Sequence, residues 1–361
     1  MAETLLVTGF PGFIGARLLP RLLELRPSAS VECLVQPKFE GTARGSIADL
    51  ERAHPHATGR IATVLGDITL DRLGLSASAA RTLQRRLTGA FHLAAVYDLA
   101  VRRDLAERIN VHGTRNVLAF LGEAKQLQRL DYISTAYVSG TAVGVFRETD
   151  LDVGQSFKNH YEETKFRAEV DVVKSGLPFA VYRPGIVVGD SRTGETAKFD
   201  GPYFALTAME RVPAPGVFIK IGSGRTTVNL VPVDFIIEAL ARLSSSPKAT
   251  GKTYHLTDPS PVSTLEIETL FAKALGKKFV FVPVPSTMAK LLFTPGPVQK
   301  LFGMPVQAID YFDHACRYDS AIATAELAAL GIVCPRFPDY VRELVKFYLE
   351  TKGKVRREAM V

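Results

Sequence analysis

The feature that most constrains this chain is a glycine-rich loop close to its first residue. An apolar, β-prone run, Thr4–Val7, is followed by Thr8-Gly9-Phe10-Pro11-Gly12-Phe13-Ile14-Gly15. The chain can turn sharply at Gly9, and Gly12 carries no side chain where an anion would approach the backbone. Gly15 allows a following helix to pack closely against the strand. The loop predicts strand, turn and helix with the helix N-terminus aimed at a phosphate, the alternative being a turn that binds nothing.

Alternating strand and helix patterns continue through the N-terminal half of the chain. Apolar residues at helical spacing follow the loop over Ala16–Leu25. Further strands are expected at Val31–Val35, Ile61–Leu65, Gly89–Leu93, Arg129–Ile133, Phe179–Tyr182 and Thr253–Thr257, and helices at Arg103–Ala124 and Tyr161–Ser175. This order predicts an α/β fold, a doubly wound and mostly parallel Rossmann sheet with helices on both faces.

Proline and glycine become frequent after residue 184, which predicts a smaller, partly helical and less regular C-terminal substrate region. We expect a dinucleotide-binding Rossmann domain over residues 1–190, with 226–258 returning to it. Residues 191–225 and 259–345 would form the substrate-binding region, and 346–361 a basic tail. Ligands of such folds bind beyond the carboxyl ends of the strands.

Composition places the chain among globular proteins. Of its 361 residues, 47% are hydrophobic and 22% are charged, and no uninterrupted apolar run is long enough to form a transmembrane segment. The first residues lack the basic segment of a signal peptide and are needed for a strand. Cys33, Cys316 and Cys334 are too few and too dispersed for a disulfide framework or a metal motif. We therefore expect a cytoplasmic protein without a metal site.

The net charge of +7 is compatible with acidic partners such as nucleotide phosphates, coenzyme A or an acidic carrier protein. The simpler explanation is a generally solvated basic surface. The sequence has no nucleic-acid-binding module, repeat or low-complexity tract, so we expect no nucleic-acid partner. It carries no pattern that specifies an oligomeric state.

Two residues further along the chain indicate acid–base chemistry. Tyr161 and Lys165 lie four residues apart, so on a helix they project from one face. A tyrosine has an ordinary pKa of about 10, but a neighbouring ammonium stabilises its phenolate and lowers that pKa. The same lysine could hold the ribose hydroxyls of a nicotinamide nucleotide. Ser134 and Thr135, at the end of a predicted strand, are both candidates for the hydroxyl that orients a substrate oxygen. With the glycine loop upstream, the pair predicts a nicotinamide-dependent oxidoreductase, although amphipathic helices often contain such a pair by chance.

Further motifs resemble those of the extended short-chain dehydrogenase/reductase family. Besides the glycine loop they are Gly66-Asp67-Ile68, Phe91-His92-Leu93-Ala94-Ala95, the segment from Asn110 to Val117, and Tyr182-Arg183-Pro184-Gly185. The resemblance implies a cofactor site lined by Thr8, Gly9, Phe10, Gly12, Phe13, Ile14, Gly15, Asp67, Ile68, Leu93, Ala94, Ala95, Asn110, Tyr161, Lys165, Pro184, Gly185 and Val187.

Within that family the chain is most similar to thioester reductases and fatty acyl-CoA reductases, the male-sterility-type group. Ser134–Gly140, Arg183–Glu195 and Asn229–Phe235 carry this resemblance, which fades after about residue 258. It implies that Thr135 orients the carbonyl, Tyr161 donates the proton and Lys165 tunes Tyr161. It also implies an acyl thioester on coenzyme A or a carrier protein. This sequence contains no adenylation or carrier domain, so the thioester would come from elsewhere.

The end of the second predicted strand bears on cofactor choice. It reads Leu34-Val35-Gln36-Pro37-Lys38, without the carboxylate that usually binds the ribose 2′-hydroxyl of NAD. Lys38 and Arg44 could neutralise a 2′-phosphate, so we expect NADPH to be preferred and NADH to remain possible. The alternative is that both residues are ordinary loop charges.

The segment Phe279–Phe302 is apolar and interrupted by prolines. We expect it to form the core of the C-terminal region. The alternatives are a pocket or lid for a long apolar chain and a peripheral contact with a membrane.

Together these patterns predict reduction of a fatty acyl or related thioester, or of its aldehyde, by NADPH. A second enzymatic possibility is a dehydrogenase or reductase of a hydroxysteroid-like or other apolar ketone, and a sugar-nucleotide epimerase fits the apolar late region less well. A different class is a cofactor-sensing binding protein. The complete set of Thr135, Tyr161 and Lys165 argues against such a sensor.

Overall fold

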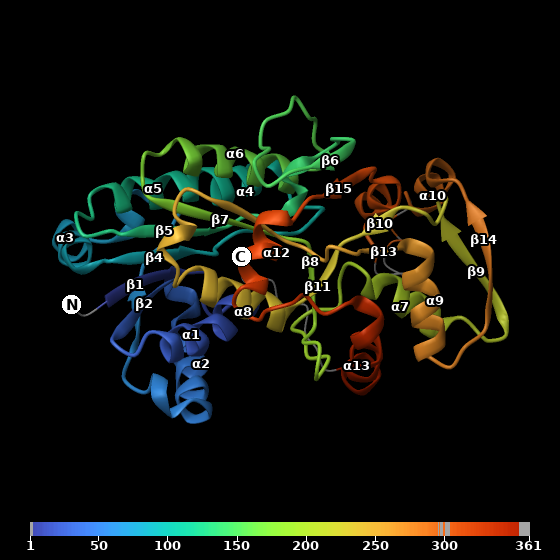
Figure 1. The fold of residues 1–361 in the computed structure, drawn as a ribbon, viewed down its shortest axis with the longest axis horizontal. Coiled ribbons are helices and arrows are strands. Elements are labelled where there is room, and N and C mark those ends of the chain that lie inside the picture. The colour runs from blue at the N-terminus through green and yellow to red at the C-terminus, as the bar shows by residue number, and fades with distance from the viewer. Residues whose placement is uncertain (1–2, 295, 297–298, 300–303, 354–361) are drawn as a thin grey trace.

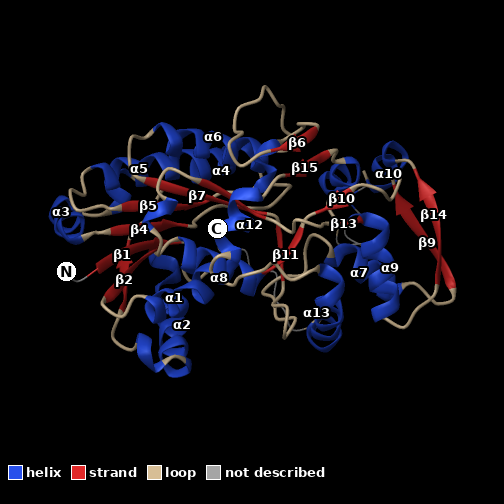
Figure 2. Ribbon diagram, in the orientation of Figure 1, coloured by secondary structure: helices blue, strands red, loops and turns tan. Residues whose placement is uncertain are grey.

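The computed structural model describes residues 3–294, 296, 299 and 304–353, and its central layer is a seven-stranded sheet (Figures 1 and 2). From edge to edge the strands are β12 (Thr253–Leu256), β7 (Phe179–Pro184), β5 (Arg129–Ile133), β4 (Gly89–His92), β1 (Glu3–Thr8), β2 (Ala29–Val35) and β3 (Ile61–Leu65). Neighbouring strands are parallel throughout. The predicted α/β fold is confirmed, and the late strand predicted at Thr253–Thr257 forms one edge of the sheet.

The chain winds in two directions from β1. It adds β2 and β3 on one side and then β4, β5, β7 and β12 on the other. Ligands of doubly wound folds bind at the carboxyl ends of the strands where this reversal occurs. The glycine loop follows β1 directly, so the topology puts it at that point.

Helices cover both faces of the sheet (Figure 1). One face carries α1 (Phe13–Leu25), α2 (Glu40–Ala53), α8 (Val233–Leu243) and α12 (Ala321–Ala328); the other carries α3 (Ala77–Arg86), α4 (Arg103–Ala106), α5 (Gly113–Gly122) and α6 (His160–Lys174). Each face buries its own apolar core. The helix predicted at Arg103–Ala124 is interrupted by a π-helical segment, Glu107–His112. Such segments are frequent at functional sites.

Short 3-10 helices connect several elements. They are η1 (Pro37–Phe39), η2 (Pro55–Ala57), η3 (Asp71–Gly74), η5 (Ala136–Ser139), η6 (Pro247–Ala249) and η7 (Val306–Asp313). The turn η5 matters most for the site, because it begins directly after Thr135 at the carboxyl end of β5.

The less regular region expected after residue 184 lies at one end of the molecule (Figure 2). Small two-stranded sheets pair β8 (Ile186–Val188) with β11 (Leu230–Pro232), β9 (Gly216–Ile221) with β14 (Phe279–Val284), β10 (Thr227–Val228) with β13 (Val262–Ser263), and β6 (Gly144–Phe146) with β15 (Cys316–Tyr318). The helices α7 (Tyr203–Arg211), α9 (Thr264–Ala274) and α13 (Phe337–Thr351) share a separate apolar core, and α10 (Ser286–Phe293) follows β14.

Two segments near the C-terminus differ from the expected domain limits. The basic tail was expected from residue 346, but α13 continues to Thr351 because Val345 and Tyr348 extend its buried face. Residues 354–361 of that tail lie outside the described residues. Ala323 and Leu327 of α12 pack into the core of the Rossmann sheet, although 259–345 was expected to form the substrate region. The wider division into domains stays a prediction.

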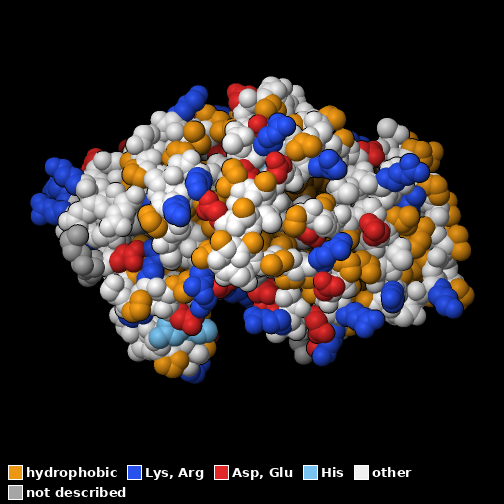
Figure 3. Space-filling model, in the orientation of Figure 1, with side chains coloured by type: hydrophobic (Ala, Val, Ile, Leu, Met, Phe, Trp, Pro, Cys, Tyr) orange, Lys and Arg blue, Asp and Glu red, His pale blue; other side chains and the backbone are white. Residues whose placement is uncertain are grey.

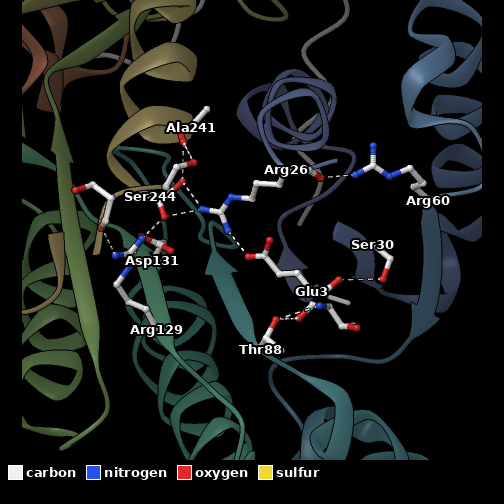
Figure 4. Close-up of polar contacts among 12 residues, drawn as sticks. Glu3, Arg26, Ser30, Arg60, Thr88, Arg129, Asp131, Ala241 and Ser244 are labelled. Carbon is white, nitrogen blue, oxygen red and sulfur yellow. Dashed lines mark hydrogen bonds and ion pairs between the residues drawn. The ribbon is translucent and has the colours of Figure 1, made fainter. Parts of the chain in front are cut away.

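At the amino ends of the strands, two arginines bind the end of α8 (Figure 4). Arg129 donates to Asp131 at 3.0 Å and to the carbonyl of Ser244. Arg26 donates to the same carbonyl at 2.6 Å and to Glu3 at 2.5 Å. The last carbonyls of a helix have no partner inside it, so these guanidinium groups cap α8 and fix it to the sheet.

Candidate active site

The glycine loop packs against the end of β4. Gly9 has a φ of +84°, and a Cβ there would lie 2.8 Å from the backbone nitrogen of Ala94. Only glycine meets both conditions without strain. A Cβ on Gly15 would lie 2.8 Å from the carbonyl oxygen of Gly9. Gly12 is the N-cap of α1, so the loop sets the start of that helix beside the ends of β1 and β4. This geometry suits a pyrophosphate.

Other predicted cofactor residues support the loop from inside. The buried hydroxyl of Thr8 accepts a hydrogen bond from the Ala94 amide at 3.1 Å and lies 2.7 Å from Nδ1 of His92. Burial lowers the pKa of His92 to about 3, so its ring is neutral. The side chain of Phe10 is buried in the core, whereas Phe13, Ile14, Leu93 and Ala95 are half-buried at the loop and the strand end.

Tyr161 lies in the first turn of α6. Burial raises its pKa to about 12, and the nearby hydroxyl of Thr135 opposes this shift. Contrary to the expectation that Lys165 would lower this pKa, the loss of solvent around the half-buried ring dominates. The phenol is therefore protonated at neutral pH and can donate a proton.

The two hydroxyls at the end of β5 have different partners. The hydroxyl of Thr135 lies near Tyr161 and lowers the pKa of that phenol. Ser134 donates to Oε2 of Glu169 instead. Of these two candidates, Thr135 is the one that the fold brings to Tyr161.

The ammonium of Lys165 lies beneath the same strand end. Nζ donates to the hydroxyl of Tyr132 and to the carbonyl of Ile133, each at 2.8 Å, and the residue is 3% exposed. Burial lowers the pKa of Lys165 to about 7, while the charge of Glu169 opposes this change. Because Ile133 stands two residues before Thr135, Lys165 ties α6 to the segment that carries that hydroxyl.

Asn110 acts inside the protein. It lies in the π-helical segment and is 1% exposed. Its Oδ1 accepts from the Val96 amide at 2.9 Å, and its Nδ2 donates to the Val96 carbonyl at 3.1 Å and to the Thr164 hydroxyl at 3.0 Å. Asn110 thus connects the loop after β4 to the helix that carries Tyr161 and Lys165.

The residues proposed to choose between NADPH and NADH lie near the ends of β2 and β3. Gln36 follows β2 and donates to Oδ2 of Asp67 at 3.1 Å. Lys38 lies with Nζ 4.9 Å from the ring centre of Phe39. Arg44 is exposed on α2 and donates to Glu40 at 2.6 Å, so its charge already has an acidic partner.

Ile68 follows Asp67 and is packed from another side. Its side chain is buried, and a Cβ on Gly113 would lie 2.7 Å from its Cδ1. Asn116 donates to the Ile68 carbonyl at 2.7 Å. The motif Gly66-Asp67-Ile68 is therefore anchored on α5.

The segment after β7 passes close to a second motif. Pro184 ends β7, and a Cβ on Gly185 would lie 2.7 Å from the carbonyl oxygen of Asn229. Val187 pairs with Val231 in the sheet of β8 and β11. Glycine is needed where these two backbones meet, so Gly185 allows the motifs at residues 183–195 and 229–235 to lie side by side.

Two residues near Tyr161 were not predicted from the sequence to belong to the site. Tyr97 follows the β4 motif and is 53% exposed, and ionisation of its phenol would raise the pKa of Tyr161. Nζ of Lys198 lies 4.7 Å from the Tyr97 ring centre and 3.0 Å from Asp200. No fixed spacing joins these residues to the recognised motifs, so only the fold brings them together.

A buried ion pair behind Ser134 was not predicted from the sequence either. Arg183 donates to Oε1 of Glu169 at 2.6 and 2.9 Å, and both side chains are almost completely buried. Its other nitrogen lies 3.1 Å from Nε2 of His255 on β12. Glu169 could have been identified from the sequence, since it stands eight residues after Tyr161 on the same helical face.

The apolar segment Phe279–Phe302 begins with a strand whose two faces differ in burial. Phe279 and Phe281 of β14 pack towards the C-terminal core, but Val217, Ile219, Val280 and Val282 of the paired strands are 42–66% exposed. Orange side chains accordingly gather over β9, β14 and α10 in Figure 3. Thus only one face of this ribbon is core; residues 295, 297–298 and 300–302 of the segment lie outside the described residues.

No described helix is both long and apolar enough to cross a membrane. Within the same residues, histidine, cysteine, aspartate and glutamate side chains form no group of three or more that could hold a metal ion.

Comparison with known proteins identifies the family. A family model described as male sterility protein matches residues 7–240. The chain belongs to this family. It is therefore an NAD(P)-dependent oxidoreductase of the extended short-chain dehydrogenase/reductase type, and the resemblance inferred from the motifs is confirmed.

Three curated relatives illustrate the range of this family. The chain is 29% identical to a nonribosomal peptide synthetase of Aspergillus flavus, 30% to a glycine betaine reductase of Emericella nidulans and 28% to a fatty acyl-CoA reductase of Drosophila melanogaster. These matches cover 73%, 74% and 65% of this chain. The chain spans only 27%, 22% and 52% of those relatives' own lengths.

Solved structures agree with the family assignment. The terminal R domain of the myxalamid biosynthetic pathway superposes with a TM-score of 0.82 and 25% identity, covering 99% of this chain and 92% of that one. The reductase domain of a nonribosomal peptide synthetase from Mycobacterium tuberculosis has the same fold, with a TM-score of 0.73, 21% identity and coverage of 97% and 92%.

Proposed function

We propose that this protein reduces an acyl thioester, or the corresponding aldehyde, with NADPH, using Thr135, Tyr161 and Lys165. The observation that carries the proposal is the meeting of α6 with the end of β5. There Thr135 lies close enough to Tyr161 for its hydroxyl to lower the pKa of the phenol, and Lys165 holds the Ile133 carbonyl at 2.8 Å. The relatives named above include a fatty acyl-CoA reductase and a peptide synthetase, which supports a thioester as the substrate.

The residues present fit a nicotinamide dinucleotide. Gly9 and Gly15 leave space that a Cβ would fill, and Gly12 caps the helix that faces the loop. Gly9–Gly15 would hold the pyrophosphate at the start of α1, and Lys165 would contact the nicotinamide ribose. Gln36, Lys38 and Arg44 would lie towards the adenosine ribose. When bound, the dinucleotide would supply a hydride.

The protein's own groups would supply the proton and the orientation. Thr135 would hydrogen-bond the substrate carbonyl oxygen, and Tyr161 would donate its proton to that oxygen as the carbon accepts the hydride. The raised pKa of Tyr161 favours the protonated form that this step requires. With a thioester, the product is a hemithioacetal whose carbon–sulfur bond then breaks to release thiol and aldehyde. Reduction of that aldehyde by a second hydride and proton would give an alcohol.

A substrate screen tests the proposal. Purified protein is mixed with NADPH and with acyl-CoAs of several lengths, aldehydes or apolar ketones, and NADPH oxidation and thiol release are followed together. Thiol release in step with NADPH oxidation is the expected result. Turnover of ketones alone would assign the protein to the alternative ketone reductases, and nucleotide binding without any turnover would favour a sensor.

A carrier-bound substrate is the second arm of the screen. The same acyl group is presented on coenzyme A and on a phosphopantetheinylated carrier protein, with equal thiol concentrations. A higher kcat/KM for one form identifies the carrier, because the reacting thioester is the same in both.

A further inference from the structure

A residue of the C-terminal region holds the first turn of α6. Tyr311, in η7, donates a hydrogen bond to Oε1 of Glu162 at 2.6 Å. The same hydroxyl accepts from Nδ2 of Asn159 at 2.9 Å. Asn159 is the N-cap of α6, and Glu162 directly follows Tyr161 in the chain. Tyr311 therefore connects both sides of the helical turn that carries the proposed acid.

Glu162 is enclosed and fully engaged. Its side chain has no exposed surface, and its Oε2 accepts from the Lys158 amide at 3.0 Å. Nζ of Lys158 lies 3.4 Å from Oε1 and also donates to the carbonyl of Gly140, at the end of the turn that begins after Thr135. One compact network thus joins the turn of Thr135, the turn of Tyr161 and η7.

Ring packing places Tyr311 against the same turn. Its ring meets that of Tyr137, in η5, at a centroid distance of 5.0 Å and an angle of 82°. Nζ of Lys158 lies 5.2 Å from the Tyr311 ring centre. Burial, together with the Glu162 carboxylate, raises the pKa of Tyr311 well above its ordinary value, so its hydroxyl stays a donor. A buried carboxylate that loses a donor is destabilised, so the turn would shift.

We propose that Tyr311 is a positioning residue, which holds Tyr161 in the geometry for proton donation by fixing Asn159 and Glu162. The inference rests on the proposed function, whose acid is Tyr161. It makes the catalytic helix depend on a residue of the C-terminal region, 149 and 152 positions away from Glu162 and Asn159. A displacement of about 1 Å can lower the rate of a reaction by about 100-fold.

The test compares two tyrosines with matched surroundings. Tyr311→Phe keeps the ring and removes the hydroxyl. Tyr254→Phe is the control, because Tyr254 is buried and also donates to a glutamate, Glu326, at 2.8 Å, but on β12 and α12 away from the proposed acid. We expect Tyr311→Phe to lower kcat about 10- to 100-fold while KM for NADPH changes less than about twofold. Tyr254→Phe should keep the parent's kcat.

Amide hydrogen exchange supplies a readout that does not depend on turnover. The amides of Lys158 and Glu162 bind the side chains that Tyr311 holds, at 3.0 Å each. We expect the peptide around residues 156–166 to exchange about tenfold faster in Tyr311→Phe, and at the parent's rate in Tyr254→Phe. Melting temperatures of all three proteins verify that the variants are folded.

The possible results distinguish failure of this inference from failure of the proposed function. Faster exchange together with a lower kcat supports the positioning role. An active parent with an unchanged kcat in Tyr311→Phe overturns the inference alone, whatever the exchange result. A lower kcat without faster exchange also overturns it, because Tyr311 would then act on something other than the turn. A parent that reduces no thioester or aldehyde rejects the proposed function itself, and this role for Tyr311 falls with it.

Discussion

The two ends of the central sheet hold buried charge in different ways. At the amino ends, Arg129 is paired with Asp131 at 3.0 Å and caps the end of α8 (Figure 4). At the carboxyl ends, the ammonium of Lys165 is held by a hydroxyl and a carbonyl, and burial lowers its pKa to about 7. Arg129 thus has an anionic partner, whereas Lys165 binds neutral groups, with the ion pair of Arg183 and Glu169 lying behind it. Strongly shifted pKa values cluster at functional sites, and buried structural groups such as Asp131 show them as well.

The difference between Arg129 and Lys165 indicates which of the two stabilises the fold and which takes part in the chemistry. A cation with a buried anionic partner cannot be removed without leaving that anion alone. A cation held by neutral groups changes its protonation more readily, and it costs stability rather than adding to it. Substitution of Arg129 should therefore alter unfolding, and substitution of Tyr161 or Lys165 should alter turnover.

The largest effect is expected for Tyr161→Phe, which keeps the ring and removes the ionisable hydroxyl. Turnover should fall by about 10²–10⁴-fold, the usual contribution of general acid catalysis. NADPH affinity and the free energy of unfolding should stay close to those of the parent. Steady-state kinetics, nucleotide titration and urea unfolding measure the three quantities. Full activity in a folded variant would remove Tyr161 from its proposed role.

Arg129→Met, at the amino ends of the strands, is expected to lower the free energy of unfolding and to leave turnover unchanged. This change leaves the buried carboxylate of Asp131 without its guanidinium partner and removes one of the two guanidinium groups that cap α8. Unfolding free energy should fall by about 3–5 kcal/mol, with the activity of the folded protein unchanged.

Arg52→Met is the matched control for that change. Arg52 pairs with Asp49 at 3.0 Å, but both side chains are more than 70% exposed, so the loss should stay within about 1 kcal/mol. Equal losses in the two variants would show that burial does not distinguish these ion pairs.

A smaller, pH-dependent effect is expected for Lys165→Met in the cofactor-free protein. Since the pKa of Lys165 is lowered to about 7 from 10.5, the unfolded chain binds an extra proton between these values. The parent should therefore gain stability relative to Lys165→Met as pH rises from 7 to 10, by at most about 1.4 kcal/mol per pH unit. Below pH 7 both states are protonated, and the difference should become constant.

Denaturant unfolding of parent and variant at pH 6, 7, 8 and 9 measures this difference. Two stability curves that run parallel above pH 7 contradict the buried, weakly basic lysine. Activity at pH 8 should fall as well, with a weaker NADPH affinity that distinguishes Lys165→Met from Tyr161→Phe.

Regular features of this fold could be predicted from sequence. The strand at Arg129–Ile133 and the helix at Tyr161–Ser175 were placed to within a residue, because local apolar patterns determine them. The glycine loop was predictable too, since Gly9 needs a positive φ and Gly15 a close approach that few other residues tolerate.

Contacts across long sequence separations could not be predicted. Nothing in the local pattern around Tyr311 indicates that it meets Glu162, and nothing around Lys198 indicates that it meets Tyr97. The pKa of Tyr161 was expected to fall, because sequence spacing reveals a neighbouring lysine but not the burial that dominates. The choice between Ser134 and Thr135 likewise required the position of Glu169.

The smallest effects are expected for cofactor choice, at the exposed side of the carboxyl ends. NADPH should be preferred over NADH without excluding it, because Lys38 is exposed and contributes about 1 kcal/mol or less. Lys38→Ala should weaken NADPH more than NADH. Gln36→Asp should shift preference towards NADH by repelling a 2′-phosphate and binding the ribose.

Gln36→Asn is the control for Gln36→Asp, because it shortens the side chain equally but keeps an amide facing Asp67. Fluorescence titrations with both nucleotides on the parent and the three variants give the ratios of dissociation constants. Because the effect of Lys38 depends on charge in solvent, it should shrink as salt is added, unlike that of the buried Lys165. Tighter NADH binding by the parent, or equal ratios in Gln36→Asp and Gln36→Asn, would reject this account of cofactor choice.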